Sequence, residues 1–302
     1  GSMRFFITGG SGFVGTRLSE HLLSRGHQVT VADLAPAGRV PPKEGFRYIQ
    51  ADTTVKGPWQ EEAAAHEGFI NLTGVPIFRR WTKSNKRKII DSRILTTENL
   101  VEAMPNRAGT ILFSTSAVGY YGFHGDEILT EQDGPGNDFL AGVCRQWEAA
   151  AETARGRGAR VIITRFGLVM GKNGGLLGML APLFRWFLGG RLGDGRQWVS
   201  WIHIEDLVNA FRFIIEREDF EGAVNLCAPH PVTNRELTAA LAGALHRPAF
   251  LPSPGFAVRL ALGEFGAAIL RGQRVHPRRL LEAGYVFQHP HITPALEGLL
   301  RR

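Results

Sequence analysis

Cysteine and long apolar runs are the features that this sequence of 302 residues has least of. Only Cys144 and Cys227 occur, which excludes a disulfide framework and a cysteine-rich metal site. No uncharged apolar run reaches the roughly 18 residues needed to span a bilayer. The longest candidate, residues 256–270, is interrupted by Arg259 and Glu264. We therefore expect a protein of the reducing cytoplasm, with no metal and no membrane partner.

Acidic residues are the minority charge, 28 against 35 Lys and Arg, which leaves a formal net charge of +7. One short run concentrates the positive charge, and a solvated helix face is its first interpretation. Attraction of an anionic cofactor or substrate is the second. Nucleic acid is not an expected partner, because only Trp81 is interleaved with the cations and no recognition motif accompanies them. The run comprises Arg79, Arg80, Lys83, Lys86, Arg87 and Lys88.

Short β-branched or aromatic runs alternate with longer amphipathic stretches through the first two-thirds of the chain. This alternation predicts an α/β fold with a Rossmann-type, doubly wound parallel sheet. Ligands in such sheets bind beyond the carboxyl ends of the strands, so informative residues should follow the strands. The expected strands are 4–8, 28–32, 46–50, 68–72, 110–114 and 160–165, and the main expected helices are 12–25, 84–103 and 140–155.

The character of the chain changes near Gly171, where a glycine-rich connection begins. Mostly helical segments with proline breaks follow it. We predict a dinucleotide-binding Rossmann domain over residues 3–170 and a smaller, mostly helical substrate lobe over 171–302. Residues 198–228 contain two strand-like stretches, 198–204 and 225–228, and we expect this segment to return to the Rossmann domain.

Gly9, Gly12 and Gly15 follow the first expected strand and open an amphipathic helix. Such a turn needs positive φ, and its backbone approaches phosphate without a Cβ in the way. The helix N-terminus then offers free N–H groups and a positive dipole to the anion. Because strand, spacing and helix coincide, the sequence predicts a nicotinamide-dinucleotide site that also includes Phe13 and Val14.

Acidic residues follow the next two strands. Asp33 comes eighteen residues after Gly15, where a carboxylate accepts both adenosine ribose hydroxyls and repels a 2′-phosphate. Asp33 therefore favours NAD, while nearby Arg39 keeps NADP as the alternative. Asp52 either accepts from the adenine amino group or initiates a turn.

The segment Leu72-Thr73-Gly74 follows the fourth expected strand. Its glycine permits a close approach of the backbone to the cofactor, and an ordinary strand-to-loop glycine is the alternative. We include all three residues in the predicted cofactor site.

The chain resembles the extended short-chain dehydrogenases of the NAD-dependent epimerase/dehydratase family along essentially its whole length. It is most similar to a subgroup described as nucleoside-diphosphate-sugar epimerases. The resemblance implies an NAD(P)-dependent oxidoreductase or epimerase that acts on a small molecule, and it adds Arg93, Ser114 and Val169 to the cofactor site. The matching motifs are Thr8–Gly15, Asn71–Gly74, Arg80–Thr82, Asp91–Arg93, Ser114–Gly122, Phe139-Leu140, Trp147-Glu148, Gly195–Trp198, Trp201–Asp206 and Asn225-Leu226.

Typical family members carry a Tyr-x-x-x-Lys pair on the helix that follows the fifth strand. With Glu148 aligned to the family's helix glutamate, Leu140 and Cys144 take the tyrosine and lysine positions. No Tyr or Lys lies anywhere between Gly122 and Gly171. The usual pair is therefore missing.

The resemblance leaves Ser116 to orient a substrate oxygen and Tyr120 or Tyr121 as a relocated acid/base. A packed turn with an aromatic plug is the alternative for the two tyrosines. The missing pair also supports a second hypothesis for function, a catalytically weak or inactive dinucleotide-binding redox sensor or scaffold.

Four residues are expected on the substrate side. Glu131 matches a family acidic residue near the active-site loop, with a surface carboxylate as the alternative. Leu168 replaces an asparagine that often holds the sugar nucleotide, so a conventional nucleotide-sugar substrate is not expected. Arg196 suits a carboxylate or phosphate, and Trp201 either lines the cleft or belongs to the core. Family members often pair through the helices equivalent to 84–103 and 140–155, which implies a homodimer.

Overall fold

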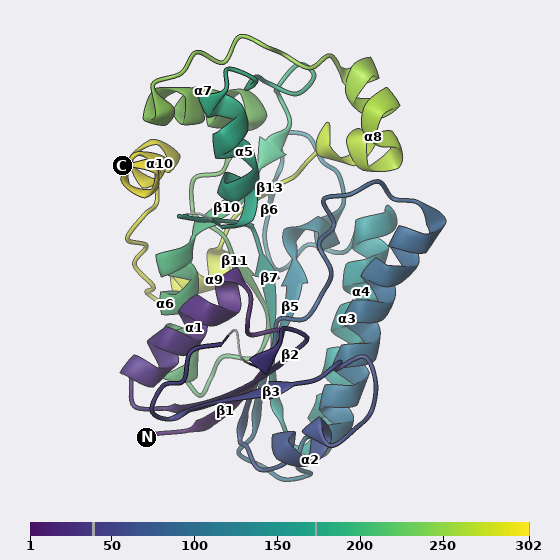
Figure 1. Ribbon diagram of the computed structural model, residues 1–302, viewed down its shortest axis with the longest axis vertical. Helices are drawn as coiled ribbons and strands as arrows, with labels where there is room; N and C mark the ends of the chain where they lie inside the picture. Colours follow the sequence, from purple (N-terminus) through teal and green to yellow (C-terminus); the bar gives the residue numbers. More distant parts are fainter. Residues whose placement is uncertain (38–39, 173, 302) are drawn as a thin grey trace.

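The computed structural model describes residues 1–37, 40–172 and 174–301. Figure 1 shows a large sheet flanked by helices in the lower part of the molecule and a smaller, mainly helical lobe above it. None of the helices in these ranges is long and apolar enough to cross a membrane.

The main sheet has seven strands, and every pairing in it is parallel. The predicted Rossmann-type fold is confirmed. The chain order reverses between β1 and β4, which makes their carboxyl ends the switch point where such sheets bind ligands. In spatial order the strands are β3 (Phe46–Gln50), β2 (Gln28–Asp33), β1 (Arg4–Thr8), β4 (Gly68–Asn71), β5 (Ile111–Ala117), β7 (Arg160–Phe166) and β11 (Gly222–Leu226).

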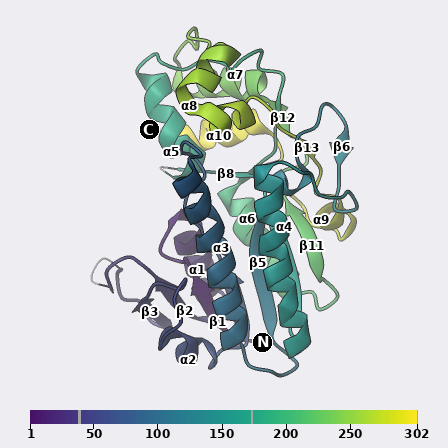
Figure 2. The same ribbon diagram turned by 90° about the vertical axis from the view of Figure 1, so that its right-hand side faces the viewer.

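Helices cover both faces of the sheet, and for this reason the central strands are apolar on both sides. α1 (Phe13–Ser24) and α6 (Ile204–Ile215) lie on one face. α3 (Lys83–Ala103) and α4 (Phe139–Glu152) lie side by side on the other, with the short α2 (Trp59–Ala63) near their lower end (Figure 2).

Local sequence explains where the helices begin and end. α1 buries Leu18 and Leu22 at helical spacing and stops before Gly26, which takes a φ of +86°. Thr82 caps the N-terminus of α3, because its hydroxyl accepts from the Asn85 N–H at 3.1 Å. The sequence did not predict α2.

The upper lobe is built from α5 (Gly175–Arg185), α7 (Asn234–Leu245), α8 (Gly255–Ile269) and α10 (Ile292–Leu300). The expected strand at 198–204 is two short strands, because β9 (Trp198–Val199) pairs with β12 (Val232–Thr233) and β10 (Trp201–His203) pairs with β8 (Leu168–Gly171). The chain then returns to the main sheet through α6 and β11. The remaining elements are β6 (Ile128–Leu129), β13 (Arg274–Val275), α9 (Arg278–Glu282) and the 3-10 helices η2 (Val118–Tyr121) and η3 (Thr153–Arg157).

Candidate cofactor and active site

The glycines of the turn after β1 have three different roles. Gly9 takes a φ of +72°, and a Cβ there would lie 2.8 Å from the Thr73 backbone. A Cβ on Gly15 would lie 2.4 Å from the Gly10 backbone, so the first turn of α1 closes directly onto the loop. Gly12 caps α1, and no protein atom lies within 4 Å of a Cβ placed on it. Gly12 therefore leaves open space at the helix N-terminus, where a phosphate fits.

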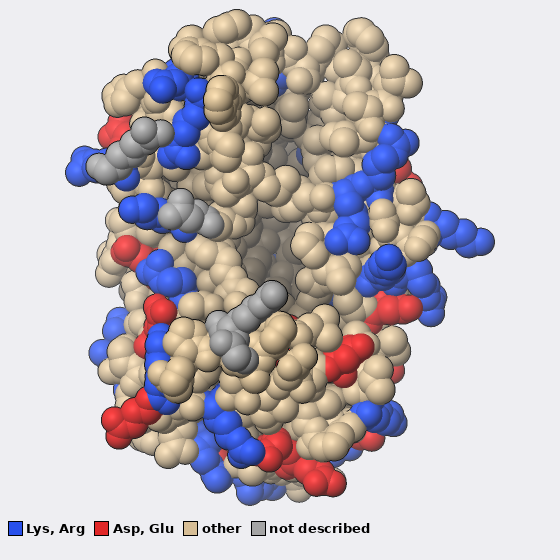
Figure 3. All heavy atoms as spheres, in the orientation of Figure 1, with Lys and Arg blue, Asp and Glu red and all other residues tan. Residues whose placement is uncertain are grey.

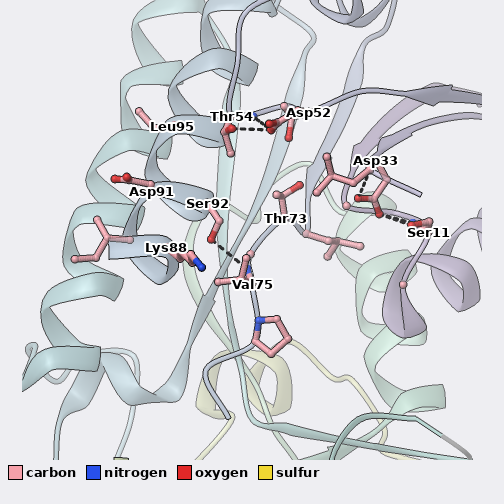
Figure 4. A pocket seen from close by; sticks show the side chains of 18 of the residues that line it. Ser11, Asp33, Asp52, Thr54, Thr73, Val75, Lys88, Asp91, Ser92 and Leu95 are labelled. Atoms are coloured by element: carbon pink, nitrogen blue, oxygen red, sulfur yellow. Dashed lines mark hydrogen bonds between the residues drawn. The ribbon is translucent and has the colours of Figure 1, made fainter. Parts of the chain in front are cut away.

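A pocket of about 1600 Å³ opens at the carboxyl ends of β1, β2 and β4, between the start of α1 and the flank of α3 (Figure 4). This is the switch point of the sheet. Most of the expected cofactor residues lie together on the walls of this pocket. They are Gly9, Gly12, Phe13, Val14, Gly15, Asp33, Asp52, Leu72, Thr73 and Gly74.

Asp33 lies on the pocket wall with its carboxylate turned toward Ser11 (Figure 4). Its Oδ2 accepts from the Ser11 N–H at 3.0 Å and from the Ser11 hydroxyl, and its Oδ1 accepts from the Leu34 N–H at 2.8 Å. These bonds hold the negative charge beside the glycine turn, where it would repel a second anion. Arg39, the residue expected to weaken this preference, lies outside the described residues.

Asp52 and Thr73 also line the pocket (Figure 4). Asp52 accepts from the N–H and the hydroxyl of Thr54, at 3.0 and 2.6 Å, which is the turn-initiating pattern. The Thr73 hydroxyl is buried and has no hydrogen-bond partner within the described part of the chain. Buried hydroxyls usually have a partner, so Thr73 fits a bound polar group.

Three expected cofactor residues lie outside this wall. Arg93 lies behind Gly74. A Cβ placed on Gly74 would lie 2.8 Å from the Arg93 guanidinium carbon. The Arg93 Nη1 donates to the Val75 carbonyl at 2.9 Å, and burial lowers the pKa of Arg93 to about 10. Ser114 has a buried hydroxyl with no partner among the described residues, and Val169 lies in β8.

The Phe13 ring connects the glycine turn to the upper lobe. A Cβ on Gly171 or Gly174 would lie 2.0 or 2.4 Å from the ring. These glycines therefore form the slot that the ring fills, at the entrance to α5.

A buried polar network lies at the end of β5. The Ser116 hydroxyl donates to Glu148 at 2.6 Å, and Glu148 forms a bidentate ion pair with Arg165 at 3.0 and 2.8 Å. The two charged side chains are only 11% and 5% exposed. Sequence reasoning missed this pair, although an arginine in an apolar strand and a glutamate on a buried helix face each need a partner. Ser116 is only 1% exposed, and its oxygen keeps acceptor capacity beside the bond to Glu148.

The two adjacent tyrosines of η2 differ in their surroundings. Tyr121 is 1% exposed, and its hydroxyl donates to Asn225 at 2.7 Å and accepts from Arg165 at 3.0 Å. Burial raises the pKa of Tyr121, which makes it a poor acid/base. Tyr120 is half-buried, and its ring centre lies 3.5 Å from the Arg165 guanidinium carbon. No hydrogen bond within the described residues engages the Tyr120 hydroxyl, so Tyr120 is the better candidate.

Comparison with known proteins assigns the chain to a family. A family model described as the NAD dependent epimerase/dehydratase family matches residues 5–227. The chain belongs to this family. A second model, a domain of unknown function (DUF1731), matches residues 253–299.

Relatives of the epimerase/dehydratase family match nearly the whole chain. The chloroplastic SDR39U1 homolog of Arabidopsis thaliana is 36% identical over 305 residues, which covers 99% of this chain and 87% of the relative. The epimerase family protein MT2273 of Mycobacterium tuberculosis is 41% identical over 297 residues, covering 96% and 95%. The crystal structure of human SDR39U1 with NADPH is 32% identical, with a TM-score of 0.85 and 99% coverage of both chains.

Leu140 and Cys144, which the resemblance places at the positions of the family's acid/base pair, both lie on α4. Cys144 is fully buried, and burial raises its pKa to about 11, so it stays a neutral thiol near pH 7. Leu140 has no proton to transfer. Neither side chain can replace the family's tyrosine or lysine.

The residues expected on the substrate side of this family member do not form one wall. Trp201 is fully buried and donates to the His230 carbonyl at 3.0 Å, so it is a core residue and does not line a cleft. Leu168 pairs with it in β8 and is half-buried. Glu131 accepts from the Asn225 N–H at 3.0 Å, and burial raises its pKa. Arg196 is exposed.

The basic run on α3 is more than a solvated helix face, because part of it lines the outer wall of the pocket. Lys86 pairs with Glu264 at 2.6 Å, and Arg87 pairs with Asp91 at 3.0 Å. This placement supports the second interpretation, the attraction of an anionic cofactor. The lining cations are Lys83, Lys86, Arg87 and Lys88.

His203, Glu205 and His289 bring three potential metal ligands within 4.8 Å of one another, a cluster that the sequence did not predict. The two imidazole rings are stacked, with centroids 3.7 Å apart and planes 12° from parallel. The His203 Nδ1 also accepts from the Glu205 N–H at 3.0 Å. A histidine nitrogen binds a metal ion in the plane of its ring. Two parallel stacked rings therefore cannot both direct a nitrogen lone pair at the same ion. Within this cluster His203 is the N-cap of α6, and His289 contacts the Glu205 carboxylate at 3.0 Å.

Proposed function

We propose that this protein is an NAD(P)-dependent oxidoreductase or epimerase that acts on a small molecule. The observation that carries the proposal is the pocket at the switch point, where Gly12 leaves open space at the N-terminus of α1. The α1 N–H groups would hold the pyrophosphate, Asp33 the adenosine ribose, and Thr73 a further polar group. A bound nicotinamide would supply the hydride donor or acceptor.

We propose that the cofactor is NAD. The human relative was crystallised with NADPH, but the Asp33 carboxylate lies on the pocket wall at the end of β2, where it would accept from the adenosine ribose and repel a 2′-phosphate. In a fluorescence titration we expect NADH to bind at least about tenfold more tightly than NADPH, a difference of about 1.4 kcal/mol. Asp33→Asn should remove most of this preference, because it removes the charge that repels the 2′-phosphate.

Asp52→Asn is the matched control, since Asp52 lies on the same pocket but bonds to Thr54. It should leave the ratio of the two affinities unchanged. Tighter binding of NADPH by the unmutated protein would refute NAD as the cofactor.

We further propose Tyr120 as the acid/base, with the Arg165 guanidinium against its ring and Ser116 as an acceptor for the substrate hydroxyl. The assay is transfer of deuterium from labelled NADH to a panel of carbonyl compounds and sugar nucleotides. Tyr120→Phe should lower the transfer rate about 100-fold or more, the usual effect of losing a general acid, and should leave NADH affinity unchanged.

Tyr121→Phe is the control, because it removes a hydroxyl of the same type from the neighbouring position. It should lower thermal stability by breaking the bonds to Asn225 and Arg165, while the folded enzyme keeps its rate. If transfer survives Tyr120→Phe and Ser116→Ala combined, the assignment is wrong.

A dinucleotide-binding redox sensor or scaffold is the second candidate. Two observations favour it. Leu140 and Cys144 cannot transfer a proton near pH 7, and the Ser116 hydroxyl already donates its hydrogen bond to Glu148. NADH binding without deuterium transfer to any compound of the panel would favour this function over the first.

We also propose that two copies pair through α3 and α4, which lie side by side on one flank (Figure 2).

We further propose that the protein works in a reducing cytoplasm. Both cysteines are free and buried, as expected there.

A further inference from the structure

Exposed large apolar side chains gather in two segments of the upper lobe, residues 172–193 and 244–263, which we call the apolar cap. Nine of the sixteen strongly exposed large apolar side chains among the described residues lie in these segments. Trp186, Phe256 and Leu260 are 78%, 73% and 81% exposed. The others are Met179, Leu183, Phe187, Leu188, Phe250 and Leu251.

Backbone hydrogen bonds join the two segments of the apolar cap. The Leu251 N–H donates to the Gly189 carbonyl at 3.2 Å, and the Ser253 N–H donates to the Arg191 carbonyl at 2.9 Å. In Figure 1 the connection between α7 and α8 crosses the top of the molecule beside the end of α5. The cap thus lies at the end of the lobe remote from α2 and the sheet.

The two segments of the apolar cap carry positive charge only, and the acidic residues Asp194 and Glu264 lie directly beyond their ends. The segments themselves contain five Lys and Arg residues and no Asp or Glu. Figure 3 shows the top of the molecule mostly tan, with lysine and arginine at its flanks and most of the acidic atoms in the lower half. The cations are Lys172, Arg185, Arg191, Arg247 and Arg259.

Phe187, which follows α5 in the apolar cap, has an unusual backbone conformation. Its φ is +61°, in the left-handed region that aromatic residues rarely adopt. The Phe187 side chain is 46% exposed, so burial of the ring does little to offset the strain of this backbone conformation. The ring centre lies 5.3 Å from the Arg247 guanidinium carbon. Such strain persists where the surrounding structure imposes it, commonly at functional sites.

We propose that the apolar cap docks on an anionic membrane surface. Exposed Trp, Phe and Leu side chains enter the boundary between headgroups and acyl chains, while arginines reach anionic headgroups. A second copy of the chain fits the surface less well, because a two-fold contact would set the same five cations against each other, and the bordering acidic residues Asp194 and Glu264 are fewer than these cations. The sequence-based expectation of no membrane partner rested on the absence of spanning runs, and surface docking requires none.

The test is co-sedimentation with vesicles of phosphatidylcholine alone and with vesicles that also contain phosphatidylglycerol. We expect at least about tenfold stronger binding to the anionic vesicles, weakened by added salt. Trp186→Ser, Phe256→Ser and Leu260→Ser combined should abolish this binding. Arg191→Gln with Arg259→Gln should weaken it and reduce its salt dependence.

The apolar control combines Val55→Ser, Ile128→Ser and Val286→Ser, which are 59%, 58% and 81% exposed outside the cap. It should bind vesicles like the unmutated protein. Circular dichroism and NADH binding verify that each variant is folded. Equal binding to both kinds of vesicle, or full binding by the cap variant, would overturn the proposal. So would a dimer in light scattering that the cap variant dissociates, because the cap would then be a protein interface.

Discussion

Gly12→Ala is expected to lower the affinity for NADH about 100-fold, or about 2.7 kcal/mol, with the melting temperature nearly unchanged. No protein atom lies within 4 Å of the added Cβ, so the folded protein accommodates it. The methyl group would instead enter the space that a pyrophosphate needs at the N-terminus of α1. Isothermal titration and thermal unfolding measure the two quantities separately.

Gly15→Ala is the matched comparison in the same turn. Its Cβ would lie 2.4 Å from the Gly10 backbone, which cannot move aside as a side chain can. We therefore expect a loss of roughly 3 kcal/mol or more in the free energy of unfolding. Equal loss of NADH affinity and of stability in both variants would show that Gly12 has a structural role and does not face the cofactor.

Glu148→Ala is expected to lower the free energy of unfolding by about 3–5 kcal/mol, because it leaves the buried Arg165 charge without its counter-ion. The guanidinium is 5% exposed, and Glu148 accepts two of its hydrogen bonds. The variant also removes the acceptor of the Ser116 hydroxyl. Urea unfolding followed by circular dichroism gives the change directly.

Glu62→Ala is the control for this experiment. Glu62 and Arg47 form the same bidentate geometry, at 2.8 and 3.0 Å, but their side chains are 36% and 64% exposed. Water screens this pair, so its loss should cost less than about 1 kcal/mol. Similar costs for both variants would mean that burial does not set the contribution of the Glu148 pair.

The sequence predicts the sheet well because the relevant signals are local. Buried parallel strands appear as short apolar runs and α1 as a repeat of leucines at helical spacing, so bounds such as Arg4–Thr8 and Phe46–Gln50 match the expected ranges. The glycine turn is also a local feature. The positive φ of Gly9 and the contact between Gly15 and Gly10 depend only on residues that are close together in the sequence. The short α2 was missed because one helical turn is too short to show a period.

Contacts across the fold were decided by the tertiary structure alone. Tyr120 and Tyr121 are neighbours with the same chemistry, yet packing commits only the Tyr121 hydroxyl to Asn225, 104 residues away, and no described residue bonds to the Tyr120 hydroxyl. Trp201 offered two interpretations, and only its position against the upper lobe made it a core residue. The apolar cap likewise depends on two distant segments that meet through backbone hydrogen bonds.

By itself, then, the sequence determined the Rossmann sheet, the turn at Gly9–Gly15 and the absence of tyrosine and lysine between Gly122 and Gly171. The tertiary structure decided which hydroxyls are available, that Glu148 and Arg165 form a buried pair, and where apolar side chains stay exposed. The physical reason is that periodicity and backbone conformation are set by neighbours along the chain. Burial and pairing, in contrast, depend on residues that only the packed fold brings together.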